Sequence, residues 1–181
     1  MHSARRASYV GGVSGRLVVV LLITALAVGC GDALLGEGGS TGAPGTGRVV
    51  RVVDGDTIHV RLPDGTKEKV RYIGVDTPES VKPNTPVQCF AKAASARNAE
   101  LVEDERVELR TDVEERDRYG RLLAYVYRVR DGAFVNAALV REGYAAPLSV
   151  PPNVRHADEF AALARTARRD GRGLWAACAG S

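Results

Sequence analysis

Short β-prone segments separated by turn sequences are the feature that most constrains the fold of this chain. The runs at 49–53 and 57–62 are rich in valine and end at Asp-Gly-Asp (54–56) and Pro-Asp-Gly (63–65). A third strand is expected over 67–75, where a glycine at position 74 is a possible bulge. The turn sequences predict that these three strands follow one another directly.

The rest of the chain alternates helical and strand-like patterns. We expect a loop over 76–87, an alanine-rich helix over 90–103 and a half-buried strand over 107–113, in which apolar and charged residues alternate. These are followed by a loop, a strand over 122–129, a helix over 135–143 and a last helix around 160–167. The order βββ-α-ββ-α-α predicts an α+β fold, a five-stranded OB-type barrel with three helices, because barrel closure removes exposed edges.

Residues 1–29 have the features of an export signal. Three arginines precede an apolar run at 17–28, which is shorter than the roughly 20 residues that a membrane-spanning helix needs. The run ends at Ala27-Val28-Gly29-Cys30, which resembles a bacterial lipobox in which Cys30 becomes the lipidated N-terminus. We therefore expect a membrane lipoprotein that faces outside the cytoplasm. Simple secretion and a buried N-terminal helix are the alternatives.

Residues 30–47 are expected to form a flexible tether, because they are rich in glycine, serine and threonine. The folded domain is then expected to span residues 48–178. Three of the 25 lysines and arginines lie in residues 1–29, which hold no acid, so 22 basic residues face 22 acidic ones in the remainder. A nucleic-acid partner therefore has to be argued from particular residues rather than from composition.

The chain has three cysteines, Cys30, Cys89 and Cys178. If Cys30 carries a lipid, the other two remain to form a disulfide in an oxidising compartment, with two buried free thiols as the alternative. Neither has a cysteine or histidine neighbour at zinc-ligand spacing. Trp175 is expected to fill the core near this bridge.

Acidic and basic side chains gather where the expected strands end, namely Asp54, Asp56, Asp76, Glu79, Arg71, Arg118 and Arg121. Carboxylates can hold Ca²⁺ or Mg²⁺ or accept a proton from water, and guanidinium groups match phosphate oxygens. The set suits metal-assisted hydrolysis of phosphodiesters, although aspartates at turns usually serve only the turn. A strict strand period would place Arg71 and Asp76 on opposite faces, which a bulge at Gly74 would correct.

Three ordered motifs resemble the staphylococcal nuclease-like (thermonuclease) family. They are Val53-Asp-Gly-Asp-Thr57, Arg71-Tyr-Ile-Gly-Val-Asp-Thr-Pro-Glu79 and Asp117-Arg-Tyr-Gly-Arg-Leu-Leu-Ala-Tyr125. The resemblance covers residues 48–175 and implies an OB barrel that cleaves DNA and RNA with calcium. By motif position it implies that Asp56 and Asp76 bind Ca²⁺ together with the backbone carbonyl of Thr77, and that Asp54 is an outer-sphere acid.

The resemblance also implies roles in catalysis and substrate binding. Glu79 becomes the general base, Arg71 and Arg121 bind the phosphate, and Arg118 and Tyr119 contact a neighbouring phosphate. The stretch 145–152 lacks the tyrosines that the best-known family member places beside the bound base, so the resemblance does not extend to base stacking.

The sequence therefore predicts an exported, calcium-dependent nuclease that hydrolyses phosphodiester bonds of DNA, RNA or both. Its expected partners are that substrate and, through the lipid, the membrane, and we expect a monomer. One alternative is a catalytically inactive OB module that binds single-stranded nucleic acid. A structural envelope lipoprotein is a third class, but it leaves the carboxylates and arginines at the strand ends without a purpose.

Overall fold

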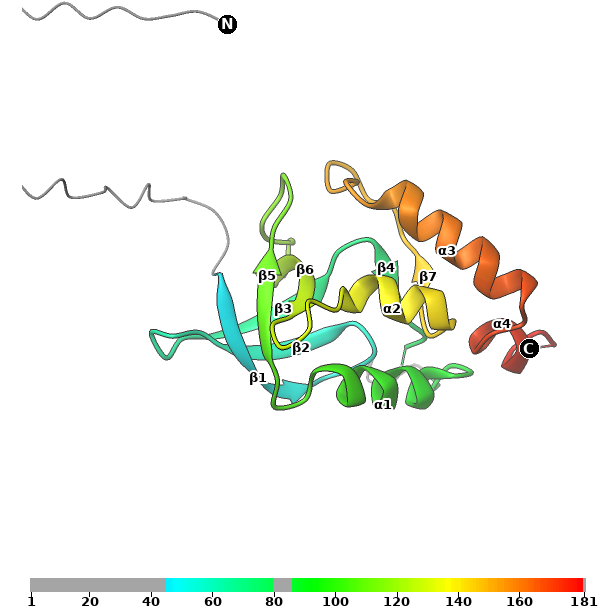
Figure 1. The fold of residues 1–181 in the computed structure, drawn as a ribbon, viewed down its shortest axis with the longest axis horizontal. Coiled ribbons are helices and arrows are strands. Elements are labelled where there is room, and N and C mark those ends of the chain that lie inside the picture. Colours follow the sequence, from blue (N-terminus) through cyan, green and yellow to red (C-terminus); the bar gives the residue numbers. More distant parts are fainter. Residues whose placement is uncertain (1–44, 80–85, 181) are drawn as a thin grey trace, which may run out of the picture. The chain divides into compact units, whose positions relative to one another are not determined.

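The computed structural model describes residues 45–79 and 86–180, so the expected signal segment, Cys30 and residues 31–44 of the expected tether lie outside it. Five strands close into a barrel in the order β1–β2–β3–β6–β5 (Figure 1). Neighbours pair antiparallel except β3 and β6, which are parallel. This confirms the predicted OB-type barrel. Its strands are β1 (Thr46–Val52), β2 (Thr57–Arg61), β3 (Lys67–Tyr72), β5 (Arg106–Arg110) and β6 (Leu122–Arg128).

The barrel interior is filled by alternate residues of its strands. Val49, Ile58, Val60, Val70 and Leu109 are buried and face one another across it. Branched aliphatic side chains suit this position because they pack well on a pleated surface. The alternate residues on the other side of β2 and β3 are therefore left on the outer face of the barrel.

Helices cover one side of the barrel (Figure 1). They are α1 (Ala91–Val102), α2 (Val135–Glu142), α3 (Ala157–Arg169) and the single-turn α4 (Leu174–Ala177). The α2 helix lies between α1 and α3 and packs on β6. It ends as predicted at Gly143, whose left-handed φ of 80° closes the helix. Three of the four helices in the described part of the chain were predicted, whereas α4 is too short to leave a periodic pattern.

The third predicted strand is interrupted, which corrects the expectation of one strand over 67–75. β3 ends at Tyr72, the chain turns at Ile73 and Gly74, and β4 (Val75–Asp76) pairs with β7 (Ala146–Pro147) in a separate small sheet. Gly74 has a φ of 78°, and a Cβ atom there would lie 2.5 Å from the Phe160 ring. The residue therefore forms a turn packed under α3 rather than a bulge.

Two predicted boundaries also change. The strand expected over 107–113 ends at Arg110, and Val113 is 72% exposed. At the N-terminal end β1 begins at Thr46, so the last two residues of the expected tether belong to the barrel. The reason is local packing, since Gly47 is buried against the β2 strand.

The C-terminal segment is fastened to the start of α1 by a disulfide between Cys89 and Cys178, with sulfur atoms 2.01 Å apart. This is the pairing expected from the cysteine count. Trp175 does not fill the core as expected, because it is only partly buried and stacks under the Arg168 guanidinium at 4.0 Å. No helix among residues 45–79 and 86–180 is long and apolar enough to cross a membrane.

Candidate active site

The turn at 54–56 presents its acidic residues because it is held by its own hydrogen bonds. The backbone N–H of Val53 donates to the carbonyl of Thr57 at 2.9 Å, and that of Asp56 to the Asp54 carboxylate at 3.1 Å. The turn also lies close to the chain after β4, since a Cβ atom on Gly55 would come within 2.6 Å of the Thr77 hydroxyl. Only glycine allows this approach.

A buried polar chain anchors the same turn to α1 and β3. The Asn98 amide donates to the backbone carbonyl of Asp54 at 2.9 Å, and the Tyr72 hydroxyl donates to Asn98 at 2.9 Å. The backbone N–H of Tyr72 donates to the carbonyl of Asp56 at 2.9 Å. Burial raises the pKa of Tyr72 well above its ordinary value, so its hydroxyl remains a donor. The turn is therefore fixed from two elements.

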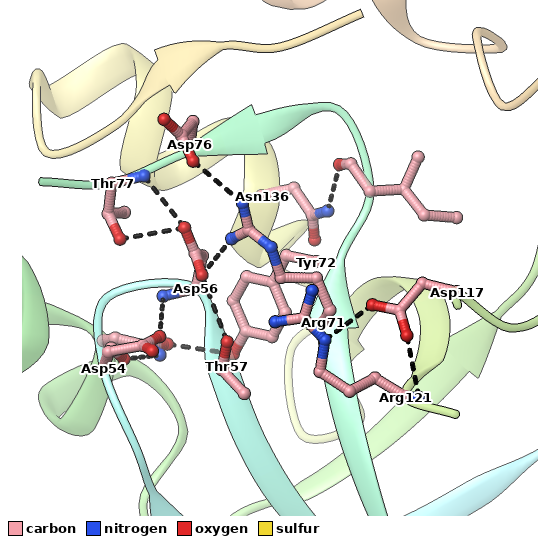
Figure 2. A network of polar contacts seen from close by, with 12 residues as sticks. Asp54, Asp56, Thr57, Arg71, Tyr72, Asp76, Thr77, Asp117, Arg121 and Asn136 are labelled. Atoms are coloured by element: carbon pink, nitrogen blue, oxygen red, sulfur yellow. Dashed lines mark hydrogen bonds and ion pairs between the residues drawn. The ribbon is translucent and has the colours of Figure 1, made fainter. Parts of the chain in front are cut away.

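Asp56 is the centre of the site (Figure 2). It is 5% exposed, and its Oδ2 accepts hydrogen bonds from the Thr77 backbone N–H at 2.8 Å and from the Thr77 hydroxyl at 2.9 Å. Its Oδ1 accepts one from the Thr57 hydroxyl at 3.2 Å and forms an ion pair with Arg71. A buried carboxylate needs such partners, and here they join the end of β4 to the start of β2.

Arg71 lies between two carboxylates. Besides Asp56, its guanidinium contacts Asp76 at 2.9 Å, and its side chain is only 15% exposed. Burial acts to lower the pKa of Arg71, but the charges of Asp56 and Asp76 outweigh it, so the pKa lies above its ordinary value. Arg71 therefore carries its charge throughout the working range of pH.

The chain turn after β3 brings Arg71 and Asp76 together. Asp76 follows Arg71 by five positions, so an uninterrupted strand would have placed their side chains on opposite faces. The turn is held by Asn136 of α2, whose amide donates to the carbonyl of Ile73 at 2.8 Å (Figure 2). Asn136 also accepts from the backbone N–H of Val126 at 3.0 Å. The turn is thus fixed between α2 and the barrel.

The carboxylates of this site favour a cation. Burial, and then the neighbouring charge of Asp56, raise the pKa of Asp54 to about 6. Asp54, Asp56 and Asp76 face one cavity of about 200 Å³, and their hard oxygens are donors that Ca²⁺ and Mg²⁺ prefer. Residues 45–79 and 86–180 contain no cluster of three histidine, cysteine or acidic side chains arranged to hold a metal. A cation would therefore share Asp56 and Asp76 with Arg71 and take backbone or water oxygens.

Arg121 enters the same cavity from the loop before β6. Its Nε donates to Asp117 at 2.6 Å, and the other oxygen of Asp117 accepts the backbone N–H groups of Tyr119 and Arg121 at 2.9 and 3.0 Å. Burial would raise the pKa of Asp117, but the hydrogen bonds from Arg121 and Tyr119 outweigh it and lower the pKa. Asp117 therefore stays ionised and orients Arg121.

A second cavity adjoins the first. It has a volume of about 440 Å³, shares Arg71 and Arg121 with the smaller cavity, and is lined by Arg118 and Tyr119 together with apolar residues such as Leu148 and Val150. Tyr119 is 67% exposed, and its hydroxyl accepts a 2.6 Å hydrogen bond from Arg118.

Glu79 lines the smaller cavity. Its backbone is held by Gln88, whose side-chain carbonyl accepts the Glu79 N–H at 2.8 Å and whose own N–H donates to the Glu79 carbonyl at 3.0 Å. Gln88 in turn precedes the disulfide-bonded Cys89. The position of Glu79 therefore depends on the cross-linked start of α1.

The structure brings the residues predicted for catalysis, metal binding and substrate binding into these two adjoining cavities. The smaller one is lined by Asp54, Asp56, Arg71, Asp76, Thr77, Glu79 and Arg121, and the larger one adds Arg118 and Tyr119. Sequence reasoning missed the supporting residues, which are Thr57, Tyr72, Gln88, Asn98, Asp117 and Asn136. Of these, Thr57, Tyr72 and Asp117 stand inside the three family-like motifs, whereas Gln88, Asn98 and Asn136 carry no local signal.

Comparison with known proteins agrees with this geometry. The sequence pattern of the family described as Staphylococcal nuclease homologue matches residues 69–177. The chain is 41% identical to a thermonuclease of Staphylococcus hyicus over 130 residues, which is 72% of this chain and 75% of that protein. It is 48% identical to a thermonuclease of Staphylococcus intermedius over 67% of this chain and 68% of that protein. Endonuclease YncB of Bacillus subtilis is 45% identical over 69% of this chain and 59% of that protein.

Proposed function

Because the chain belongs to the staphylococcal nuclease homologue family and is a nuclease, we propose that it is a calcium-dependent enzyme that hydrolyses phosphodiester bonds of DNA, RNA or both. The observation that carries this proposal is one polar cavity shared by two arginines, the acidic pair Asp56 and Asp76, and Glu79.

The chemistry assigned to the chain's own residues is an attack of water on phosphorus. Arg71 and Arg121 would bind the non-bridging oxygens of the phosphate and stabilise the charge that develops on them. Glu79 would accept the proton of the attacking water as its oxygen bonds to phosphorus. The ester P–O bond on the opposite side then breaks, and the departing oxygen takes up a proton from solvent water.

The metal would be held by Asp56, Asp76 and the backbone carbonyl of Thr77, with Asp54 in an outer position. Carboxylate and carbonyl oxygens are ligands that Ca²⁺ prefers. The pKa of Asp54 is raised first by burial and then by the charge of Asp56, and a bound cation would offset that charge. When bound, Ca²⁺ would supply positive charge to the phosphate oxygens.

Cleavage of single-stranded DNA and RNA by the purified domain tests this function. We expect activity with Ca²⁺, no activity with chelator, and recovery when Ca²⁺ returns. Glu79→Gln should lower turnover by ~10²–10⁴ because the amide cannot take a proton. Glu103→Gln is the matched control, since Glu103 is exposed on the surface after α1. Full activity in chelator would refute the metal, and unchanged turnover in Glu79→Gln would refute the base.

The same assay addresses the inactive nucleic-acid-binding module. That alternative expects oligonucleotide binding without any hydrolysis by the parent protein, and no effect of Glu79→Gln other than on affinity. A binding module has no chemical need for Glu79 in the cavity, which is why we favour the enzyme. The products of cleavage would also show whether internal or terminal bonds are cut.

We also propose that the enzyme is exported and acts as a monomer at the outer surface of the membrane, attached through a lipid on Cys30. The basic start, the short apolar run and the lipobox-like ending of residues 1–30 support this. Mass spectrometry of the mature protein should find an acylated N-terminus at Cys30, and Cys30→Ser should release the protein from membranes. A soluble mature form that begins at another residue would contradict the lipid anchor.

A further inference from the structure

The outer face of the barrel carries two cross-strand rows of basic residues on its paired strands. Directly paired positions form the first row across β5, β1, β2 and β3, and the second row across β1, β2 and β3. The first row is Arg106, Arg48, Arg61 and Lys67, and the second is Arg51, His59 and Lys69. We call these seven residues the basic face. The β2–β3 turn beside it projects away from the helices in Figure 1.

The cations of the basic face are not neutralised by nearby acids. All six lysines and arginines in it are exposed, and none forms an ion pair with a carboxylate within residues 45–79 and 86–180. Arg48 donates instead to the backbone carbonyl of Asp104 at 2.5 Å. Several arginines elsewhere are paired: Arg97 contacts Glu142 at 2.6 Å and Arg116 contacts Glu68 at 2.8 Å. Other arginines that form no ion pair with the described residues, such as Arg141 and Arg165, are not gathered in cross-strand rows.

Such an arrangement is unfavourable for the isolated protein. Like charges directly opposite each other on paired strands destabilise a sheet. His59 senses the resulting field, because burial and the charges of Lys69 and Arg51 lower its pKa. The chain after residue 29 holds as many acidic as basic residues, so the basic face is a local accumulation rather than a consequence of composition. Unpaired cations gathered on one surface match a polyanion.

The basic face leads directly into the candidate active site along β3. Lys67, Lys69 and Arg71 occupy alternate positions, so their side chains leave the same side of the strand, with steps of about 6–7 Å between them. Arg71 is paired with Thr57 in the β2–β3 register and reaches Asp56 and Asp76. A chain of phosphates bound along β3 would therefore arrive at the arginine assigned to the reacting phosphate.

We propose that the basic face binds the phosphate backbone of the nucleic-acid substrate at nucleotides beyond the scissile bond and guides the strand to Arg71. The proposal rests on the proposed nuclease function, because it concerns the same substrate. It adds a binding surface on the outer side of β1, β2 and β3 that is separate from the two cavities.

Nucleic acid fits this surface better than an anionic membrane does. Next to the basic face, the carboxylates of Asp54, Asp56 and Asp76 surround Arg71, and the Asp76 side chain is 58% exposed. A planar anionic surface laid against the basic face would meet these acids as well. A single strand can follow β3 and present one phosphate at a time to the arginines.

A charge-neutral variant with a matched control tests the proposal. The face variant is Arg61→Gln/Lys67→Gln/Lys69→Gln, and the control is Lys92→Gln/Arg141→Gln/Arg165→Gln, which removes three exposed cations elsewhere. Lys67→Arg/Lys69→Arg keeps the charge and should retain affinity. Thermal melts establish that each variant is folded.

Binding is measured first, without turnover. A fluorescent single-stranded oligonucleotide long enough to span β3 and the cavity is titrated in the presence of chelator at several salt concentrations. We expect the face variant to bind at least about tenfold more weakly, and the slope of log K against log salt to fall by about 2, because three phosphate contacts are lost. The control variant should keep the parent slope.

Kinetics then separate this surface from the catalytic cavity. For the long oligonucleotide with Ca²⁺, the face variant should have a higher KM and an unchanged kcat. For a nucleoside aryl phosphodiester, which is too short to reach Lys69, both constants should stay at the parent values.

Three results would overturn the proposal. The first is a salt slope in the face variant equal to that of the parent, and the second is an equal loss of affinity in the control variant. The third is a face variant that loses binding to phosphatidylglycerol vesicles but still binds the oligonucleotide as the parent does. A parent that binds but does not cleave would refute the nuclease function and leave the basic face supported. If the parent cleaves the oligonucleotide but the face variant binds it normally, the nuclease function is supported and the basic-face proposal is refuted.

Discussion

Replacing Asp117 by asparagine separates the orientation of Arg121 from its charge. One carboxylate oxygen of Asp117 accepts the backbone N–H groups of Tyr119 and Arg121, and the other accepts the Arg121 Nε at 2.6 Å. In Asp117→Asn the amide oxygen can keep the two backbone hydrogen bonds, because it occupies the same place. The amide nitrogen is a donor and cannot accept from Arg121. The loop should therefore stay folded while the guanidinium loses its fixed position.

The expected size of the effect follows from the lost contact. A hydrogen bond between ionised partners is worth about 1.5–3 kcal/mol. The side chains of Arg121 and Asp117 are 27% and 16% exposed, so solvent screens the pair and the lower part of that range applies. If the loss falls on the transition state, about 1.5–2 kcal/mol corresponds to a drop in kcat of about 10- to 30-fold. Thermal stability should change much less.

Steady-state kinetics on an oligonucleotide with Ca²⁺ measure this drop, and a double-mutant cycle identifies its route. If Asp117 acts only by orienting Arg121, Asp117→Asn should have almost no further effect on kcat in an Arg121→Ala background. An equal fall in kcat in both backgrounds would show that Asp117 acts independently of Arg121. An unchanged kcat in the single variant would refute the positioning role altogether.

Further predictions concern stability. Cys89→Ser/Cys178→Ser should lower the free energy of unfolding by about 2–4 kcal/mol, since the bridge joins residues 89 positions apart, and urea denaturation measures this loss. Unreduced mass spectra of the parent protein should show no free thiol at either position. The folded state lowers the pKa of His59 below 6.5, so the unfolded chain binds the proton more readily. The free energy of unfolding should therefore fall as the pH drops below about 6.5. In melts recorded at several pH values, His59→Gln should reduce this dependence on pH. Gly74→Ala should cost at least about 1–2 kcal/mol for its positive φ, with an added clash against Phe160, and an unchanged melting temperature would contradict the turn geometry.

Much of the fold could be predicted because its signals are local. Alternating apolar residues and the turns at 54–56 and 63–65 define β1, β2 and β3 well, and the glycine at 143 ends α2 where expected. The closing of the barrel also followed from the number of short strands. The split between β3 and β4 could not be predicted, because it depends on Phe160, which is distant in sequence and packs where a Gly74 side chain would be.

The candidate site shows the same division. The acids and arginines stand at strand ends and form recognisable motifs, so their gathering could be expected from sequence. Their supports could not, because Asn98 and Asn136 lie in helices and look like ordinary helical residues until the fold places them under the turns. Buried amides of this kind are chosen by the backbone groups that they satisfy, which only the tertiary structure identifies.

The equal numbers of acidic and basic residues after position 29 conceal a separation of charge that bears on how a nuclease of this design holds its substrate. The smaller cavity has four acidic residues and two arginines among its lining, so without a cation it repels the phosphate that it is proposed to cleave. The proposed basic face would supply affinity for nucleic acid outside this cavity, through the unpaired cations of β1, β2 and β3. Because Arg71 belongs both to β3 and to the cavity, it is the point at which binding along the strand becomes binding at the reacting phosphate.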